Sequence, residues 1–528
     1  MNLVTWALSG EYDEDQPILI DADSPDRFVS RKRAVELVAS LAGQFPRNST
    51  VCLHVANDIL YPILVLAILA SECRWTGTNT AYTVAELVHH LNISRSDIVI
   101  TARQHLDVVR KAVQVHGSDV EIIIYADLLQ DTTGELDESS TNNGDWGFDS
   151  LRTMRDLVQH PVSDDIATVT KGISPDSIAA LMQTSGTTGQ PKLATRTHRS
   201  MMIEQQAIED NDLEKPYKVR RLYCIPIFHA FAAPEMMFNV LRLGQQSYFM
   251  KRFDDTFAQK VHEFGVTEIA GAPPLLLKLA NTPDCQHLLQ SVRLISYGGA
   301  ALGPELRKQT MGIFEVPPRI VPVYGMTEGG WFTMLKHPED DDSGSVGRPI
   351  AGYEIKVVPQ IGAELQSGQV VGEVLVRGPQ LMTEYLNNPS ATAEAFENGW
   401  LKTGDIGYIR DGKVYLVDRA KDLIKVSGFQ VAPAELEDAL LESPDILDAA
   451  VVGVGQDVDE HPLACVVPRG ASVTVERVKS HLRKRLTGYK VNRCEVRFVE
   501  SIPKSSSGKM LRKVLKEQIS LQGVALMR

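Results

Sequence analysis

Apolar residues recur along roughly the first 175 positions of this chain in two alternating patterns. Within residues 31–45, Ala34, Val38 and Leu41 recur at helical spacing and predict a helix with one buried face. Further helices are predicted at 59–69 and 84–91, and short β-rich runs predict strands at 51–55, 98–101 and 121–125. Beyond this region, another helix is predicted at 200–208. This alternation predicts an α/β fold of layered sheets with parallel strand pairs.

The pattern changes twice toward the C-terminus. Residues 344 to about 417 form short apolar runs separated by turns, which is typical of an antiparallel β subdomain. Residues 422–528 alternate predicted strands and helices over a length typical of a small α+β domain. We therefore predict a large N-terminal domain, 1–417, joined through 418–421 to a small C-terminal domain, 422–528.

Composition narrows the class of protein. A chain of 528 residues is expected to hold roughly two to four domains. A net charge of -13 argues against a nucleic-acid partner or adhesion to anionic lipid. The six cysteines are scattered and form no Cys-x-x-Cys pair, so neither a zinc site nor a disulfide framework is indicated. Such usage fits a reducing compartment.

The chain carries no sequence signal for a membrane span or for export. Its most hydrophobic segment, 59–70, is too short to cross a bilayer and is bracketed by Asp58 and Glu72. Acidic residues at 13–15 precede any apolar core long enough for a signal peptide. The last residues do not form a Ser-Lys-Leu peroxisomal address. We therefore expect a cytoplasmic protein.

A loop rich in hydroxyls and glycine follows the apolar run 178–182. It ends at Lys192 and contains, in order, Thr184, Ser185, Gly186, Thr187, Thr188 and Gly189. Glycine lets backbone N–H groups approach an anion closely and the hydroxyls add donors, so the loop suits a polyphosphate. It is not a Walker A loop, because no Gly-Lys-Ser/Thr stands at the required spacing. An ordinary flexible turn is the alternative.

A second polar motif ends the apolar run that begins at residue 321. It reads Tyr324-Gly325-Met326-Thr327-Glu328. A hydroxyl and a carboxylate side by side at a strand end can hold a phosphate and the Mg²⁺ that neutralises it. The alternative is a helix cap, where threonine is also common.

Four other positions each allow two interpretations. Asp405 could accept from the two hydroxyls of a ribose or occupy a turn. Lys509, after a Ser/Gly loop, could present a mobile ammonium to an active site or lie in a solvated tail. His229, alone in an apolar run, could line a pocket or be a core residue. Residues 298–300 could bring the backbone close to a ligand or form a tight turn.

Taken in order, these motifs resemble the acyl-adenylate-forming superfamily of acyl-CoA synthetases, peptide-synthetase adenylation domains and beetle luciferases. The pattern is closest to 4-coumarate-CoA ligase-like acyl- or aryl-CoA ligases. The order is the phosphate loop, Tyr-Gly-Met-Thr-Glu, Thr-Gly-Asp, Asp-Arg-x-Lys and Ser-Gly-Lys, and the agreement runs from about residue 30 to 515. Five motifs in the same order argue against a chance match.

The resemblance implies where ATP and the acid bind. The ATP- and AMP-binding residues would be Thr184, Ser185, Gly186, Thr187, Thr188, Gly189, Lys192, Gly299, Ala300, Tyr324, Gly325, Asp405 and Arg419. The acyl pocket would be lined by His229, Gly298, Gly299 and Trp331, with His229 near the carboxylate.

The resemblance also implies roles in catalysis. Lys509 would stabilise the adenylating transition state, while Thr327 holds a phosphate and Glu328 holds Mg²⁺. The small domain would be mobile and rotate about a hinge at Lys421. The rotation would bring a loop with Lys425, Gly428 and Gln430 to the site for the thioester step.

The implied reaction has two halves. The acid's carboxylate attacks the α-phosphate of ATP and displaces pyrophosphate, and the thiol of CoA then displaces AMP from the acyl-adenylate. The expected partners are a small carboxylic acid, ATP with Mg²⁺, and CoA. A separate carrier protein is the alternative acceptor, a luciferase-like oxidation is a remote third activity, and an inactive acyl-nucleotide-binding protein is the alternative of another class.

The chain departs from the usual family pattern at several positions. Leu193 follows the loop lysine where glycine is usual, and Ser427 stands where many relatives carry lysine. Trp331 and Phe332 occupy positions where many relatives have small residues. These aromatic residues suggest a pocket for a short to medium-chain or aryl acid, and turnover of palmitate would contradict that expectation.

Overall fold

The computed structural model describes the chain except residues 130–150, 160, 162, 164, 185–190, 210–213, 365–369, 421, 427–428, 456–459, 471, 487, 506–509 and 526–528. At 360–364, 425, 429–430, 489 and 520–525 it describes the backbone only. The chain forms two compact units. The first unit is Met1–Ile269, Met326–Trp331 and Gly378–Glu394, and the second is Ala270–Gly325, Phe332–Arg377 and Ala395–Arg528.

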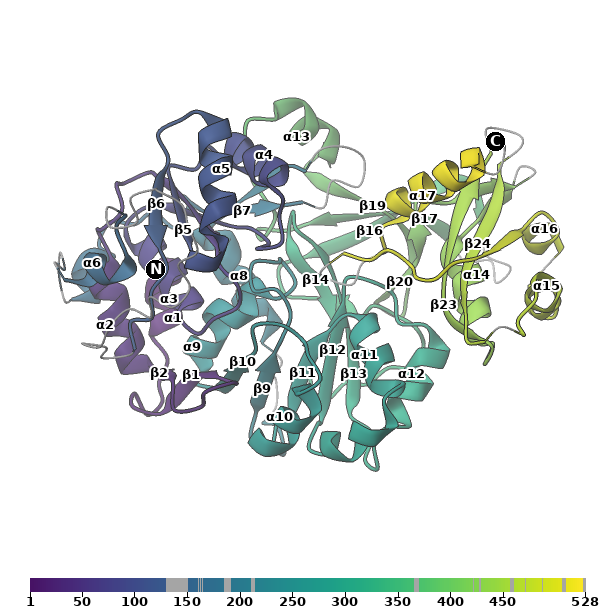
Figure 1. Ribbon diagram of the computed structural model, residues 1–528, viewed down its shortest axis with the longest axis horizontal. Coiled ribbons are helices and arrows are strands. Elements are labelled where there is room, and N and C mark those ends of the chain that lie inside the picture. Colours follow the sequence, from purple (N-terminus) through teal and green to yellow (C-terminus); the bar gives the residue numbers. More distant parts are fainter. Residues whose placement is uncertain are drawn as a thin grey trace. The chain divides into compact units, whose positions relative to one another are not determined.

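The first unit contains a six-stranded sheet with strand order β6-β5-β3-β4-β7-β8 (Figure 1). Neighbouring strands are parallel except β7 and β8, which are antiparallel. The bounds are β3 Thr50–His54, β4 Arg74–Gly77, β5 Ile98–Thr101, β6 Glu121–Ile124, β7 Ile178–Gln183 and β8 Leu193–Thr197. The predicted α/β fold with parallel pairs is confirmed. Leu193 begins β8 and is buried, which gives a physical reason for an apolar residue there.

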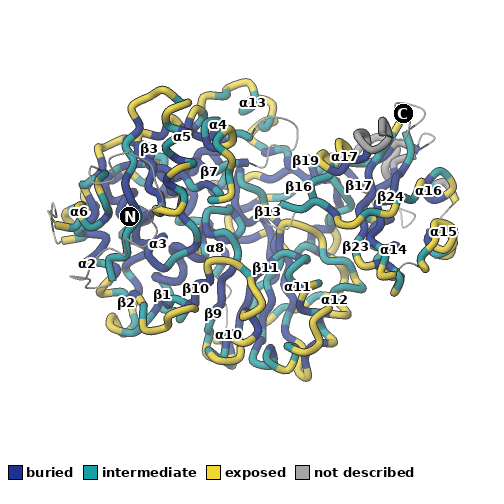
Figure 2. The backbone as a smooth tube through the Cα atoms, viewed as in Figure 1, coloured by how far each residue is buried: buried dark blue, intermediate teal, exposed yellow. Residues whose placement is uncertain are grey.

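Helices cover both faces of this sheet, because strand residues alternate between two apolar clusters. Val51 and Leu53 belong to the cluster around α3, whereas Cys52 packs with α4 and α5. The helices are α1 Leu3–Leu8, α2 Arg31–Leu41, α3 Tyr61–Ala70, α4 Val84–Ser94, α5 Leu106–His116, α6 Met154–Val158 and α7 Ile166–Val169. Every residue of α3 is buried, which explains why its sequence has no polar face (Figure 2).

Two helix boundaries differ from prediction for local reasons. Helix α2 ends at Leu41 instead of residue 45, because Ala42 is already extended and Gly43 adopts a positive φ of 78°. Helix α4 continues to Ser94, three residues past the predicted end, and Arg95 then closes it in the left-handed region. Its N-terminus carries a capping box between Thr83 and Glu86.

A second group of strands has the order β11-β9-β10-β1-β2 and belongs to the first unit, except that β11 continues past its boundary at Ile269. All pairs are parallel except β1 and β2. The strands are β1 Pro17–Asp21, β2 Phe28–Ser30, β9 Arg220–Tyr223, β10 Gln246–Phe249 and β11 Glu268–Gly271. The accompanying helices are α8 His198–Ile208, α9 Val240–Leu243 and α10 Phe257–Phe264, with a π-helical turn at Glu235–Asn239.

The second unit begins with the parallel pair β12, Leu294–Gly298, and β13, Arg319–Met326, accompanied by α11, Pro273–Ala280, and α12, Pro304–Met311. The antiparallel pair β14–β15 follows, and then an antiparallel sheet whose β character matches that predicted for 344–417. These strands are β14 Gly330–Met334, β15 Arg348–Pro349, β16 Glu354–Glu364, β17 Val370–Arg377, β18 Phe396–Glu397, β19 Trp400–Arg410 and β20 Lys413–Arg419. Helix α13, Pro389–Ala395, precedes β18 in the sequence and belongs to the first unit up to Glu394.

The C-terminal part of the second unit has its own apolar clusters on the two faces of the sheet β23-β24-β25. The strands are β21 Ile424–Val426, β22 Phe429–Val431, β23 Ile446–Val454, β24 His461–Pro468 and β25 Glu495–Phe498. The helices are α14 Pro433–Leu441, α15 Val475–Arg483, α16 Gly488–Val491 and α17 Arg512–Ala525. This matches the predicted alternation of strands and helices after residue 422.

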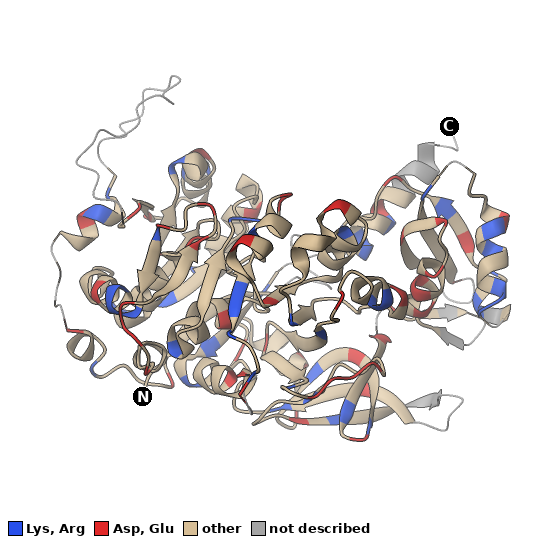
Figure 3. Ribbon diagram, turned by 90° about the horizontal axis from the view of Figure 1, so that it is seen from below, with Lys and Arg blue, Asp and Glu red and all other residues tan. Residues whose placement is uncertain are grey.

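Neither the charged residues nor the cysteines gather in one part of the chain. Basic and acidic side chains are interspersed along the chain (Figure 3). All six cysteines are free thiols, and five of them are buried. Among the residues that the structure describes, no helix combines the length and the apolar character needed to cross a membrane.

Candidate active site

The turn between β13 and β14 holds a buried carboxylate in the first unit. Glu328 is 6% exposed, and its Oε1 accepts the Tyr385 hydroxyl at 2.6 Å. The Glu328 carbonyl accepts the Met382 N–H at 2.6 Å, so both backbone and side chain are fixed by the 378–394 segment. Among the described residues, Glu328 forms no ion pair. Residues 327–329 form a turn into β14, which excludes the helix-cap alternative for Thr327.

Tyr385 is a site residue that the sequence did not indicate. Its hydroxyl holds Glu328, and the Lys192 ammonium lies 4.2 Å from the centre of its ring. Burial, and then the Glu328 charge, raise the pKa of Tyr385 well above its usual value, so the hydroxyl keeps its proton and donates. One tyrosine therefore contacts both a predicted metal ligand and a predicted phosphate ligand.

The two ends of the predicted phosphate loop are joined by hydrogen bonds. The Thr184 N–H donates to the Lys192 carbonyl at 2.8 Å, and the Lys192 N–H donates to the Thr184 hydroxyl at 3.2 Å. Between them, Ser185, Gly186, Thr187, Thr188 and Gly189 lie outside the described residues.

The strand that leads into this loop is supported from α4. His90 is fully buried, and its Nδ1 lies 2.6 Å from Oε1 of Gln183, the last residue of β7. Burial lowers the pKa of His90 to about 4, and burial lowers the pKa of His54 at the end of β3 to about 4 as well. Both imidazoles are therefore neutral at physiological pH.

A second buried carboxylate lies in the second unit. Asp405 is 8% exposed, and its Oδ2 accepts the Tyr324 hydroxyl at 2.8 Å. Its Oδ1 lies 3.3 Å from the Arg419 guanidinium, its register partner across β19 and β20. Burial, and then Asp405, raise the pKa of Tyr324 well above its usual value. Asp405 lies within β19, so it is not a turn residue.

Aromatic residues of the first unit form a wall beside His229. The Trp331 indole N–H donates to the Phe231 carbonyl at 3.1 Å, and the two rings stack with centroids 5.8 Å apart. The Phe231 N–H donates to Nδ1 of His229 at 3.3 Å, and His229 is half-buried. Trp331 and His229 therefore flank the same residue, as expected if both line one pocket.

The predicted residues 298–300 belong to the second unit and end β12. Gly298 is buried, whereas Gly299 and Ala300 are exposed. Gly299 has a φ of +81°, a conformation that favours glycine, so the tight turn is present. Gly325 is likewise exposed, next to Tyr324 on β13.

For the residues predicted for the thioester step, the structure describes the backbone of Lys425 and Gln430 only. Lys425 and Gln430 face each other in the backbone register of the hairpin β21–β22. Gly428 of that hairpin, the predicted hinge residue Lys421 and the predicted catalytic Lys509 lie outside the described residues. An antiparallel bridge between Lys504 and Met510 joins the chain on either side of Lys509.

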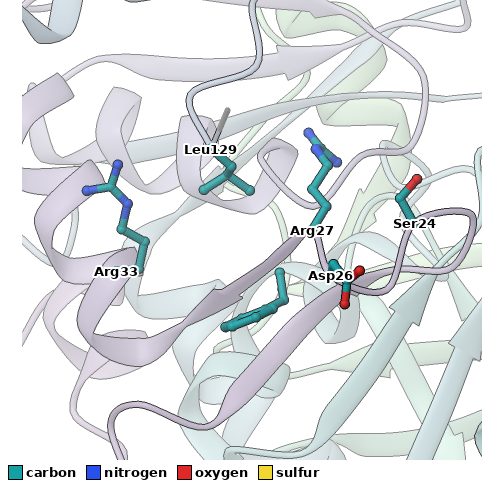
Figure 4. A pocket seen from close by; sticks show the side chains of 6 residues that line it. Ser24, Asp26, Arg27, Arg33 and Leu129 are labelled. Atoms are coloured by element: carbon teal, nitrogen blue, oxygen red, sulfur yellow. The ribbon is translucent and has the colours of Figure 1, made fainter. Parts of the chain in front are cut away.

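A surface hollow of about 470 Å³ lies elsewhere in the first unit and is not the candidate site. Its lining residues are Ser24, Asp26, Arg27, Phe28, Arg33 and Leu129 (Figure 4). The Arg27 guanidinium is occupied by three carboxylates, those of Asp21, Asp58 and Asp127. It therefore links chain segments and has no free donor pair for a ligand anion.

Comparison with known proteins identifies the family of this chain. Residues 19–386 match the AMP-binding enzyme family and residues 435–509 match the AMP-binding enzyme C-terminal domain. Acyl-CoA ligase M9 of Phoma sp. (strain ATCC 20986 / MF5453) is 49% identical, covering 98% of this chain and 96% of its own. 4-Coumarate-CoA ligase 2 of Narcissus pseudonarcissus is 34% identical, covering 93% of this chain and 86% of its own.

The fold agrees as well. The crystal structure of the anthranilate CoA ligase AuaEII in complex with anthranoyl-AMP superposes with a TM-score of 0.85 at 20% identity, covering 99% of this chain and 98% of that one. The resemblance drawn from five motifs is thus confirmed along nearly the whole length, and the chain belongs to the AMP-binding enzyme family.

Proposed function

We propose that this protein is an AMP-forming acyl-CoA ligase, which uses ATP to join a small carboxylic acid to the thiol of CoA. Family membership supports the adenylation half of the reaction. Relatives named acyl-CoA ligase and 4-coumarate-CoA ligase support CoA as the acceptor. The observation that carries the proposal is the buried Glu328 carboxylate, fixed by Tyr385 on the turn after β13.

The two half-reactions require little covalent chemistry from the protein. A carboxylate oxygen of the acid bonds to the α-phosphorus of ATP, and the bond to pyrophosphate breaks. The sulfur of CoA then bonds to the acyl carbon, AMP leaves, and the thiol proton passes to solvent. Catalysis therefore depends on holding two anions together and stabilising charge at phosphorus. Lys509 is the proposed cation for the first step.

The residues present fit a magnesium ion. Mg²⁺ is usually held by one or two carboxylates together with substrate phosphates, and Glu328 offers a fixed carboxylate with no ion-pair partner among the described residues. When bound, the ion would neutralise charge on the phosphates of ATP. We assign Thr327 and Lys192 to the phosphates, with the loop residues Thr184 to Gly189.

The nucleoside is assigned to the second unit. We propose that Asp405 accepts from the ribose hydroxyls and that Arg419 contacts the same ribose. Tyr324, Gly325, Gly299 and Ala300 are assigned to the nucleotide as well. The Tyr324 hydroxyl already donates to Asp405, which leaves the carboxylate oriented for a second donor.

A domain rotation is proposed between the half-reactions. The boundaries are 1–417, a hinge at 418–421 with Lys421 as pivot, and 422–528. Rotation would remove Lys509 and bring Lys425, Gly428 and Gln430 to the acyl-adenylate. The opposed register of Lys425 and Gln430 supports a shared role, because it places both at one position of the hairpin.

We propose a short to medium-chain or aryl acid as substrate, bound by His229, Gly298, Gly299 and Trp331. The stacked Phe231 and Trp331 support this choice. Both the backbone N–H and the indole N–H of Trp331 are hydrogen-bonded, so the ring resists the movement that would make room for a long acyl chain. A separate carrier protein is the second candidate acceptor. The six free thiols favour a reducing compartment, and the cytoplasm is the proposed location.

The test is pyrophosphate release with ATP and Mg²⁺ across a panel of carboxylic acids, each with and without CoA. Release that becomes sustained only with CoA supports the ligase, and release that CoA does not change points to a carrier protein. Lys509→Ala should lower the rate on the order of 10²-fold or more. The exposed lysine Lys513 offers a matched control, because Lys513→Ala removes a similar charge on the neighbouring helix. Turnover of palmitate would contradict the proposed acid class.

A further inference from the structure

A fully buried ion pair joins β8 to α8 in the first unit. Arg196 and Glu204 are 2.8 Å apart, and both side chains are 0% exposed. Burial raises the pKa of Glu204, although the Arg196 charge and a backbone N–H oppose the shift. Burying two charges costs about as much free energy as their attraction returns, so such a pair is a weak source of stability. Its position therefore calls for another explanation.

The second oxygen of Glu204 contacts the turn that carries the proposed site. Oε1 accepts the Trp331 N–H at 3.1 Å. Gly330 passes directly over the carboxylate, because a Cβ at that position would lie 1.9 Å from Oε1. Gly330 also has a φ of +75°, so glycine is required there twice over. Glu204 thus sets how closely the turn approaches α8.

Trp331 is fixed at two points by these contacts. Glu204 holds its backbone, and the Phe231 carbonyl holds its indole nitrogen at 3.1 Å. Glu328, three residues earlier, is fixed independently by Tyr385 and Met382. A change at Glu204 should therefore move the aromatic wall more than the proposed metal ligand.

We propose that Glu204, held by Arg196, is a positioning residue that sets acid selectivity by fixing the backbone of Trp331. The inference rests on the proposed function, in which Trp331 lines the acyl pocket. The inference adds that the size of acid the pocket accepts depends on the Glu204 acceptor behind Trp331, as well as on the size of the Phe231 and Trp331 rings. The substrate class this favours is a compact aryl acid whose ring meets a rigid indole.

The test separates the acceptor from the charge. Arg196→Met/Glu204→Gln removes both charges and keeps an acceptor for the Trp331 N–H. Arg196→Met/Glu204→Met removes both charges with similar side-chain shape and leaves that buried N–H unpaired. We expect the second protein to show a KM for the acid about 10-fold above that of the first, with KM for ATP within about twofold.

Selectivity gives a second readout that loss of stability alone would not change. The best aryl acid of the panel is compared with its analogue carrying one extra methyl group on the ring. A close-fitting pocket separates such a pair by roughly 10-fold or more in kcat/KM. The ratio should be kept in Arg196→Met/Glu204→Gln and fall at least about fivefold in Arg196→Met/Glu204→Met.

Equal acid KM and equal selectivity in the two double variants would overturn the inference. If the Met/Met protein does not fold, as judged by thermal unfolding, Glu204→Asp replaces it, because it keeps the charge and withdraws the acceptor by one methylene. An unchanged acid KM in Glu204→Asp would then overturn the inference. If the wild-type protein releases no pyrophosphate with any acid, the proposed function fails and this inference fails with it; wild-type activity with indistinguishable variants overturns the inference alone.

Discussion

Glu328 and Asp405 are both buried carboxylates that accept a hydrogen bond from a tyrosine hydroxyl, at 2.6 and 2.8 Å. They differ in what else surrounds them. Asp405 is paired with the Arg419 guanidinium, whereas Glu328 has no ion-pair partner among the described residues. A buried carboxylate is costly unless a positive charge compensates it.

The difference distinguishes two kinds of ligand. Glu328 has no such arginine among the described residues, so a bound cation is the partner that we propose for it, which suits Mg²⁺. Asp405 is already compensated by Arg419, so it acts mainly as an oriented acceptor, which suits the neutral hydroxyls of a ribose. Both carboxylates accept a tyrosine hydroxyl, but only Asp405 also pairs with an arginine among the described residues. We therefore assign a cation to Glu328 and neutral hydroxyls to Asp405.

The largest expected effect is that of Glu328→Gln. The amide keeps the shape and can still accept the Tyr385 hydroxyl, but it no longer attracts a cation. We expect kcat/KM for pyrophosphate release to fall on the order of 10³-fold. Thermal unfolding should show no loss of stability, because no ion pair with a described residue is broken. A fall of less than about 10-fold would reject the assignment of Glu328 to the metal.

Asp405→Asn should have a smaller effect of a different kind. The variant should weaken the proposed contact with the neutral ribose diol, so KM for ATP should rise about 30-fold while the Mg²⁺ dependence is unchanged. Titrations of rate against ATP and against free Mg²⁺ measure both quantities, and a shift in the Mg²⁺ titration would contradict the comparison.

Removing the tyrosine hydroxyls that donate to Glu328 and Asp405 should have smaller effects than changing the carboxylates themselves. Tyr385→Phe removes the hydrogen bond to Glu328, the proposed metal ligand, and should raise the Mg²⁺ concentration for half-maximal rate about 10-fold. Tyr324→Phe removes the bond behind Asp405 and should raise KM for ATP by a few-fold, about 3 to 5. The two variants lose the same atom, so each serves as the control for the other. Identical profiles would show that the two carboxylates are equivalent.

A still smaller effect is expected on acidification, which should lower the stability of the first unit before that of the second. His54 and His90 in the first unit have folded pKa values of about 4, below the usual 6.5, so the unfolded chain binds their protons first as the pH falls. Stability is therefore lost between pH 6.5 and 4, by about 1 kcal/mol per histidine at pH 5.5. Urea unfolding at pH 7.5 and 5.5 measures this loss, and His90→Asn should reduce it.

The second unit provides the contrast in pH. Burial opposes ionisation of Asp341, but hydrogen bonds from Lys413, Ser345 and Ser343 lower its pKa to about 2. Because that value lies below the usual 3.8, its contribution to stability is complete above pH 3.8 and is lost only as the pH falls toward 2. An equal loss of structure in both units at pH 5.5, followed by hydrogen exchange, would contradict this ordering.

The sequence predicted what local patterns determine. Continuous apolar runs predicted the parallel strands, and the end of the run that begins at residue 321 predicted the end of β13, at Met326. The ligands assigned to the motif Tyr324 to Glu328 stay a prediction. The helix 200–208 also contained a signal that was not used, since Glu204 lies at helical spacing between the buried Met201 and Ile208. A charge on an apolar face indicates a buried partner, but no spacing rule connects it to Trp331.

Tyr385 shows the limit of such prediction. It lies in a segment without a recognisable motif, and it reaches Glu328 only because 378–394 folds back onto the turn after β13. Contacts between residues that far apart depend on tertiary packing, which local periodicity does not contain. The residues that orient the site are therefore harder to find than those that are assigned to bind the ligands.

The buried cysteines have a consequence for self-acylation. An acyl-adenylate reacts with thiols, so a protein that forms one is at risk of acylating itself. Burial raises the pKa of Cys224, which precedes the His229 loop, to about 12, and raises those of Cys73, Cys465 and Cys494 to about 11. Only the thiolate attacks efficiently, so these thiols stay inert at neutral pH and leave the activated acyl group to the acceptor thiol. Cys285, which is partly exposed, is the position where acylation of the protein should be sought.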